Sequence, residues 1–127
     1  MNDPIINELI SLAQQDNEIA ALWLYGSRAK GNFSAESDYD LAVLFNNRIA
    51  DKLDSRLRPE LLAMDWRASF QNRKLELSIL DVNQVMIPLA FNAINGKLLY
   101  SNDEGLRMSA EAIICSKAEI DFKHNNL

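Results

Sequence analysis

Two apolar segments of strand length, IAALWLY at residues 19–25 and DLAVLF at 40–45, restrict the fold of this chain more than any other feature. Neither segment alternates between apolar and polar residues, as a strand with one face in water does. We therefore predict two strands that are covered on both faces. The second segment opens on Asp40, with Asp38 two residues earlier, and a buried carboxylate is costly unless a metal ion, hydrogen bonds or solvent compensates for it.

The remaining sequence predicts helices around a small sheet. The other expected elements are a helix after Asp3-Pro4, a helix over 49–71 interrupted or restarted near Pro59, a strand at 74–81, a helix over 83–95 that Pro88 can delay, a strand at 97–100 and a helix from 101 onward. This order predicts an α/β or α+β fold, with a small mixed sheet flanked by helices. At 127 residues, we expect a single domain over 1–127.

Composition narrows the function. Thirteen Lys and Arg against eighteen Asp and Glu give a net charge of −5, so no direct contact with nucleic acid is expected. The single histidine, His124, lies in a polar tail, which excludes a Ser-His-Asp triad or a multi-histidine zinc site built from this chain alone. Any catalysis is therefore expected to depend on carboxylates and a hard metal ion.

Cysteine content and the first residues bear on location. A single cysteine, Cys115, allows no internal disulfide. The start, MNDPIINELI, has neither a basic segment nor a long apolar run, so we expect no signal peptide and no membrane span. A cytoplasmic location is the expectation.

The carboxylates at the start of the second strand are candidate metal ligands. Side chains two residues apart in a strand share a face, with Cα atoms roughly 6 to 7 Å apart, so Asp38 and Asp40 can converge on one ion. Mg2+ prefers such oxygen ligands, and a third acid would complete a two-ion site. Glu76 in LELSIL is the first candidate for that acid, although the same pattern fits a solvent-facing residue; Asp81, at the strand end, is the rival.

Gly26 and Ser27 follow the first strand directly. Glycine allows the backbone to approach a ligand closely, and the next amides, at the start of a turn or short helix, can cradle phosphate together with the Ser27 hydroxyl. Arg28 and Lys30 are close enough in sequence to neutralise a triphosphate. The alternative is a tight turn with solvated cations.

The stretch GSRAKGNFSAESDYD matches the pattern Gly-Ser, ten residues, Asp-x-Asp. In this it resembles the nucleotidyltransferase superfamily related to DNA polymerase beta, and in particular its minimal nucleotidyltransferase (MNT) antitoxins. The resemblance extends to LELSILD and NAINGKLLYSNDE, and so covers nearly the whole chain. It implies the polymerase beta-like fold, with Glu76 in the place of an acid that is often Asp in this superfamily.

The resemblance also implies an activity and a partner. MNT antitoxins pair with a HEPN-domain RNase toxin, and the implied reaction is Mg2+-dependent transfer of AMP from ATP to a toxin tyrosine. Asp38, Asp40 and Glu76 would bind two ions, and Gly26 and Ser27 the phosphates. The alternatives are a non-catalytic antitoxin that binds and occludes its toxin, and a small-molecule enzyme similar to aminoglycoside nucleotidyltransferases.

Overall fold

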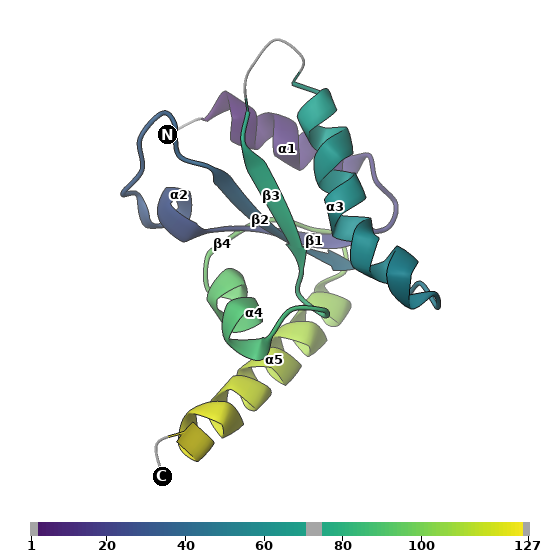
Figure 1. The fold of residues 1–127 in the computed structure, drawn as a ribbon, viewed down its shortest axis with the longest axis vertical. Helices are drawn as coiled ribbons and strands as arrows, with labels where there is room; N and C mark the ends of the chain where they lie inside the picture. The colour runs from purple at the N-terminus through teal and green to yellow at the C-terminus, as the bar shows by residue number, and fades with distance from the viewer. Residues whose placement is uncertain (1–2, 71–74, 126–127) are drawn as a thin grey trace.

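The computed structural model describes residues 3–70 and 75–125, and its elements alternate between helix and strand (Figure 1). In chain order they are α1 (Pro4–Gln14), β1 (Ile19–Tyr25), α2 (Gly26–Lys30), β2 (Tyr39–Phe45), α3 (Lys52–Ala68), β3 (Leu77–Asp81), α4 (Ile87–Ile94), β4 (Lys97–Ser101) and α5 (Glu104–Asn125). The predicted order is confirmed, with the short α2 added. Residues 71–74, where the predicted helix ends and the predicted third strand begins, lie outside the described residues.

Within the described residues, four strands form one mixed sheet in the order β3-β2-β1-β4. β1 pairs antiparallel with both β2 and β4, whereas β2 and β3 are parallel. A parallel pair needs a crossover connection, and α3 provides it. Because β1 and β2 are antiparallel, the end of β1 meets the start of β2, with Tyr25 opposite Asp40.

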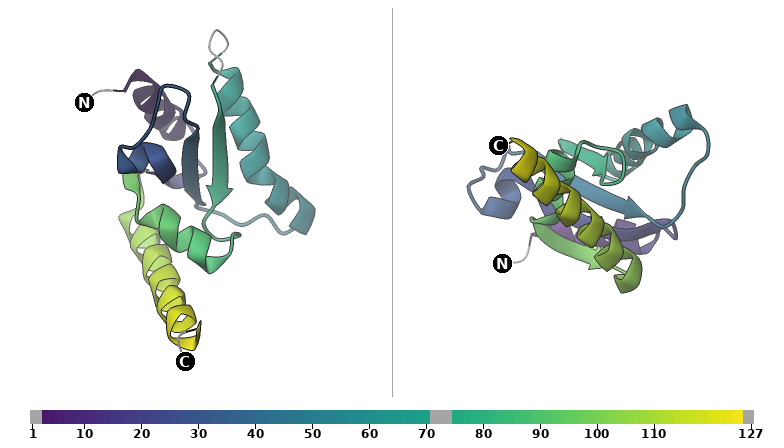
Figure 2. Two further views of the ribbon diagram at one scale, coloured as in Figure 1. Left: turned by 60° about the vertical axis from the view of Figure 1, so that its left-hand side comes forward. Right: turned by 90° about the horizontal axis from the view of Figure 1, so that it is seen from below.

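Helices cover both faces of the sheet, as the two continuous apolar segments predicted. One face packs against α1 and α3, through buried residues such as Leu22, Leu41, Leu9 and Trp66. The other packs against α4 and α5, through Trp23, Leu44, Ala90 and Ile114. Figure 2 shows α5 continuing well beyond the sheet.

The first helix begins as its sequence predicts. Asp3 is the N-cap residue, its Oδ1 accepts a hydrogen bond from the Ile5 amide at 2.9 Å, and Pro4 occupies the first turn. Asp3 Oδ2 also accepts a hydrogen bond from the Tyr39 hydroxyl at 2.9 Å, which ties the start of α1 to β2.

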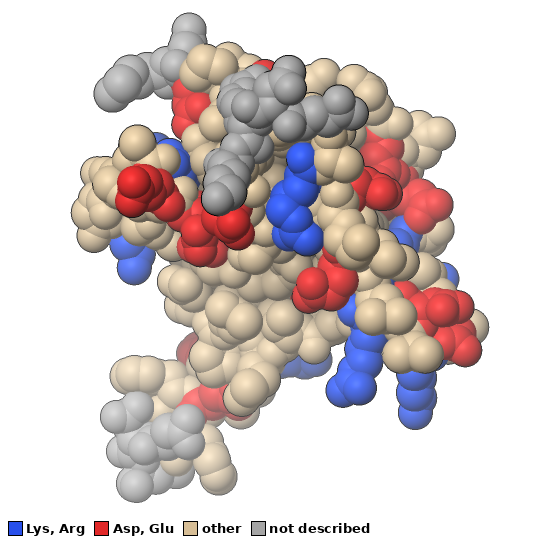
Figure 3. Space-filling view, turned by 45° about the horizontal axis from the view of Figure 1, so that its top comes forward, with Lys and Arg blue, Asp and Glu red and all other residues tan. Residues whose placement is uncertain are grey.

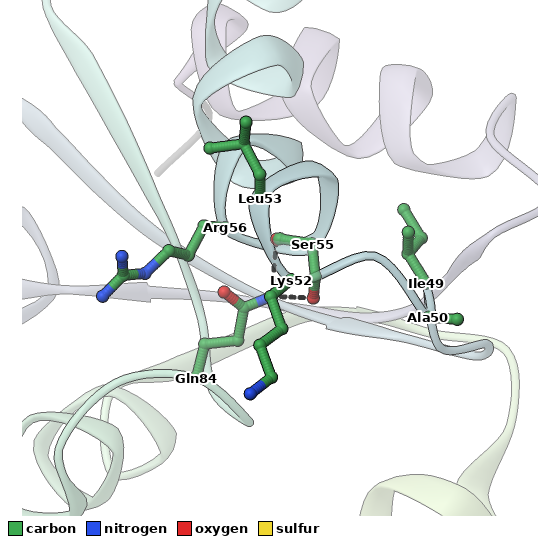
Figure 4. Close-up of a pocket in the computed structure, with 7 residues that line it drawn as sticks. All are labelled: Ile49, Ala50, Lys52, Leu53, Ser55, Arg56 and Gln84. Carbon is green, nitrogen blue, oxygen red and sulfur yellow. Dashed lines mark hydrogen bonds between the residues drawn. The ribbon is translucent and has the colours of Figure 1, made fainter.

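The predicted break near Pro59 is wrong, because α3 runs through this residue without interruption. Proline lacks the amide that would bond to the Ser55 carbonyl one turn earlier. Gln84 Nε2 donates to that carbonyl instead, at 2.7 Å, and to Ser55 Oγ at 2.9 Å (Figure 4). A side chain from the turn after β3 therefore satisfies the acceptor that Pro59 leaves open.

The predicted helix over 83–95 begins later, at Ile87, with Pro88 in its first turn. The preceding residues form a turn in which the Gln84 amide donates to the Asp81 carbonyl at 3.0 Å. In the described parts of the chain, no helix combines the length and apolar character needed to cross a membrane.

Candidate active site

Gly26 brings the end of β1 into contact with the carboxylate of Asp40. Its φ of +73° is a conformation that glycine adopts readily and other residues avoid. A methyl group at this position would collide with Asp40 Oδ2 and lie 3.2 Å from Asp40 Cγ. The backbone at the start of α2 and the Asp40 carboxylate are therefore close neighbours.

Asp40 lies at the open start of the parallel β2–β3 pair. Its partner in the register is Ser78, and Ser78 Oγ donates to Asp40 Oδ1 at 3.3 Å. Tyr25 faces it on the antiparallel side, where burial first, and then the negative charge of Asp40, raise the pKa of the Tyr25 hydroxyl. Neither Ser78 nor Tyr25 was among the predicted site residues, although strand alternation places Ser78 on the face that Glu76 was expected to share.

The three acids do not converge as expected. Asp38 and Glu76 both lie just outside their strands and are exposed to solvent. The Glu76 carbonyl accepts a hydrogen bond from the Tyr39 amide at 2.9 Å, so the backbones of the two acidic segments are adjacent. Over residues 3–70 and 75–125, however, no three Asp, Glu, His or Cys side chains come close enough to hold a metal ion.

Glu76 lies at the sheet edge, between two surfaces. It borders a pocket of about 360 Å³ together with Ile5 and Tyr39, on the side of the sheet that α1 covers. Strand alternation, continued from Ser78, instead assigns it to the face of Asp40. Within residues 3–70 and 75–125, no hydrogen bond or ion pair holds the Glu76 carboxylate on either side.

Arg28 differs most from its expected position. Only 8% of the residue is exposed, and its guanidinium donates to the carbonyls of Ser34, Ala35 and Ser37. It also stacks on the rings of Phe33 and Tyr39. The guanidinium that was expected to meet phosphate is thus directed into the loop before β2.

The other two predicted phosphate contacts remain accessible. Ser27 is half-buried in the first turn of α2, and Lys30 is exposed at its last residue. Among the described residues, the N-cap position, Tyr25, contributes no side-chain hydrogen bond to α2. The amides at the start of α2 therefore lack this common side-chain acceptor.

Asp81 does not belong to this site. It pairs in register with Val43, three residues further along than Asp40, and is only 6% exposed. Its Oδ1 accepts from the Asn83 amide at 2.8 Å and its Oδ2 from Gln84 Nε2 at 3.1 Å. Burial raises the pKa of the Asp81 carboxyl despite these hydrogen bonds. It serves the turn after β3.

The donor set fits a hard cation in part. Asp38 and Asp40 offer carboxylate oxygens at one strand start, which are the ligands that Mg2+ prefers, and Gly26 leaves room beside Asp40 that any larger residue would fill. Two carboxylates leave most positions around such an ion to water and phosphate oxygens, as is usual for Mg2+.

Acidic and basic side chains are mixed on the face of the molecule that Figure 3 shows. Figure 3 shows acidic side chains in several separate patches, with Lys and Arg between them and projecting at one side. A separate pocket of about 640 Å³, lined by Lys52, Arg56 and Gln84 among others, lies at the start of α3 (Figure 4). Because β2 and β3 are parallel, that pocket is at the opposite end of the pair from Asp40.

Residues 7–105 match the family described as polymerase beta, nucleotidyltransferase. This match spans most of the chain and includes the Gly-Ser turn, Asp38, Asp40 and β3. The chain therefore belongs to the polymerase beta nucleotidyltransferase family.

One curated protein is similar to this chain in sequence. The spectinomycin 9-adenylyltransferase of Campylobacter jejuni is 26% identical over 110 residues, which are 84% of this chain and 41% of that protein. The chain thus spans less than half the length of the curated relative that it matches.

Solved structures of toxin–antitoxin pairs share the fold. One, a toxin–antitoxin with AMP-PNP, has a TM-score of 0.74 and 17% identity, covering 95% of this chain and 92% of that chain. Another, a tri-AMPylated HEPN toxin of Shewanella oneidensis in complex with an MNT antitoxin, has a TM-score of 0.68 and 15% identity, covering 96% and 90%. At these identities the likeness concerns the fold.

Proposed function

We propose that this chain is an MNT antitoxin that transfers AMP from ATP to a tyrosine hydroxyl of a HEPN RNase toxin and thereby neutralises it. The observation that carries the proposal is the contact between Gly26 and the Asp40 carboxylate, which joins a candidate phosphate-binding turn to a candidate metal ligand. The family supports nucleotidyl transfer, and the fold shared with toxin–antitoxin structures supports the partner. Because the proposed reaction uses ATP as its substrate, we propose that it takes place in the cytoplasm.

In this proposal the tyrosine oxygen attacks the α-phosphorus of ATP. A P–O bond forms to the tyrosine while the bond from the α-phosphorus to the bridging oxygen breaks, and pyrophosphate leaves. The amides after Gly26, with Ser27 and Lys30, hold the phosphates in line with the acceptor. Asp38 and Asp40 bind Mg2+, which when bound neutralises charge that develops on the phosphates.

Glu76 has the role of third acid in the proposal. From the sheet edge, its carboxylate would turn toward the face of Asp40, where it would help to hold a second ion and would accept the proton of the incoming hydroxyl. The adjacent backbones of Glu76 and Tyr39 support this assignment, because they place the two acidic segments side by side. Exposure of Glu76 leaves it free of packing that would prevent the rotation.

The adenylyltransferase relative favours one other function, transfer of AMP to a small molecule. The two functions separate in one experiment. The chain is incubated with Mg2+ and ATP labelled at the α-phosphate, together with a HEPN protein, if the neighbouring gene encodes one, or with spectinomycin. Label on a tyrosine of the HEPN protein, located by mass spectrometry, with loss of its RNase activity, supports the proposal.

Two other outcomes contradict it. Full neutralisation of the RNase without label would establish occlusion, and label on spectinomycin alone would establish a small-molecule transferase. Omission of Mg2+ should stop the transfer while complex formation persists, because the ion serves the chemistry and not the protein interface.

A further inference from the structure

The loop between α2 and β2 is organised around the side chain of Arg28. Arg28 Nε donates to the Ser37 carbonyl at 2.9 Å, and its NH2 group donates to the carbonyls of Ser34 and Ala35, each at 3.3 Å. Such bonds from a charged donor are stronger than those between neutral groups. One buried side chain therefore binds three carbonyls of the loop backbone that leads to Asp38.

Two aromatic rings hold the guanidinium in place. Its central carbon lies 3.9 Å from the centroid of the Tyr39 ring and 4.8 Å from that of Phe33. A planar guanidinium stacks on such rings in a way that a lysine ammonium does not reproduce. Tyr39 is itself anchored through its hydroxyl to Asp3, at 2.9 Å.

Arg28 lies on the other face of the sheet from the Asp40 carboxylate, although it lines the same pocket as Glu76. Tyr39, on whose ring it stacks, belongs to the core beneath α1 and α3, whereas its strand neighbour Asp40 points to the opposite face. The guanidinium in this position is separated from the Asp40 face by β2 itself. Any effect on the reaction must therefore pass through the backbone of the loop.

The Ser37 carbonyl belongs to the peptide that joins Ser37 to Asp38. Arg28 fixes this peptide on one side of Asp38, and the Glu76 carbonyl fixes the Tyr39 amide on the other, at 2.9 Å. These two hydrogen bonds hold the backbone from which the exposed Asp38 side chain extends.

We propose that Arg28 is a positioning residue, which holds the peptide before Asp38 so that the Asp38 carboxylate is directed toward the cation. The inference rests on the proposed function for the identity of that cation, and it assigns Arg28 no contact with nucleotide. A residue that orients a metal ligand in this way typically affects metal affinity about 10- to 100-fold.

The substitution Arg28→Lys tests this, because it keeps the positive charge and loses the planar fork. The probe is Mn2+, added together with an ATP analogue in which a methylene group replaces the oxygen between the α- and β-phosphates. Electron paramagnetic resonance measures how much Mn2+ is bound. We expect the dissociation constant for Mn2+ to rise about 10- to 100-fold, with faster amide hydrogen exchange over residues 32–38. Affinity for the analogue without metal should stay unchanged. The matched control is Arg56→Lys, at an exposed position of α3, which should match the wild type in every measurement.

A second variant covers the case in which Arg28→Lys fails to fold. Phe33→Ala removes one of the two rings at a residue that is 48% exposed. The loss of one such stacking contact should weaken Mn2+ binding about two- to fivefold. Weaker binding in step with faster loop exchange supports the positioning role.

The opposite pattern would overturn it. If Arg28→Lys weakens binding of the metal-free analogue and leaves Mn2+ affinity and loop exchange unchanged, Arg28 contacts the phosphates and does not position Asp38. Neither measurement requires turnover, so a wild-type chain that transfers AMP to no acceptor contradicts the proposed function and leaves the test of Arg28 intact. A wild-type chain that binds no Mn2+ with the analogue overturns both.

Discussion

Asp40 and Asp81 are two carboxylates at opposite ends of the same parallel strand pair, and their surroundings differ in kind. Asp81 is buried and accepts hydrogen bonds on both oxygens, from the Asn83 amide and from Gln84. Asp40 is half-buried, it accepts a long hydrogen bond from the exposed Ser78 hydroxyl, and the backbone of Gly26 lies against it. A carboxylate whose acceptors are already used stabilises a turn, whereas one with free acceptor capacity at an open strand end is suited to a ligand.

The largest expected effect is on AMP transfer, when the carboxylates proposed to bind the metal ion are removed. Asp38→Asn together with Asp40→Asn should lower AMP transfer about a thousandfold or more, because charge stabilisation by a bound metal is worth several kcal/mol. Circular dichroism and the melting temperature should stay close to those of the wild type. The control, Asp54→Asn with Glu60→Gln, removes two charges from exposed positions of α3 and should transfer normally. Comparable transfer by the Asp38 and Asp40 variant would rule out the metal role.

A second experiment perturbs Asp40 through its neighbour. Gly26→Ala adds a methyl group that collides with the Asp40 carboxylate, and we expect transfer to fall about 100-fold from this misplacement. Gly31→Ala is the matched control, because Gly31 also has a positive φ, of +83°, but nothing lies within 4 Å of the added carbon. Both variants should lose about 1–2 kcal/mol of unfolding free energy from the backbone conformation. Equal transfer by the two would show that the Gly26–Asp40 contact is unimportant for the reaction.

A third experiment changes the surroundings of Asp81, at the opposite end of the β2–β3 pair from Asp40. Gln84→Leu removes the donors to Asp81 Oδ2 and to the Ser55 carbonyl, and should lower the unfolding free energy by about 1–3 kcal/mol in chemical denaturation. Transfer per folded molecule should be unchanged. Gln15→Leu, which removes an exposed amide bonded to Ser11, should alter stability by no more than about 0.5 kcal/mol. A Gln84 variant as stable as the Gln15 variant would refute the role assigned to Gln84.

The smallest effect is a change in pH dependence. Burial raises the pKa of the Asp81 carboxyl above its ordinary value of 3.8, so the folded state holds this proton more tightly than the unfolded state. Stability from this group therefore falls as pH rises from the ordinary pKa through the raised one. Asp81→Asn should remove that fall in denaturation curves recorded between about pH 3 and pH 7. An unchanged pH profile would contradict the assignment.

The strands and the Gly26–Asp40 contact could be predicted from sequence because their causes are local. Burial on both faces produces the continuous apolar segments of β1 and β2, and the antiparallel pairing of neighbours in the chain brings the end of one to the start of the next. Strand alternation likewise puts Ser78 on the same face as Glu76, and the register of β2 and β3 makes this the face of Asp40.

The features that sequence reasoning missed depend on distant partners. α3 passes through Pro59 because Gln84, 29 residues beyond Ser55, supplies the missing donor. Arg28 turns inward because the rings of Phe33 and Tyr39 and the loop carbonyls together form its binding site, which only the folded loop assembles. The directions of Asp38 and Glu76 follow from no pattern, since both lie outside the strands.

The parallel pairing of β2 and β3 also links ligand binding at the candidate active site to folding of the chain. Ser78 and Asp40 are 38 positions apart in sequence and meet only when the crossover through α3 has formed. A ligand held across these two strands binds the folded chain and not the unfolded one, so at 100 times its dissociation constant it adds about 2.7 kcal/mol of stability. The lifetime of the chain against proteolysis would then follow the supply of its own substrate.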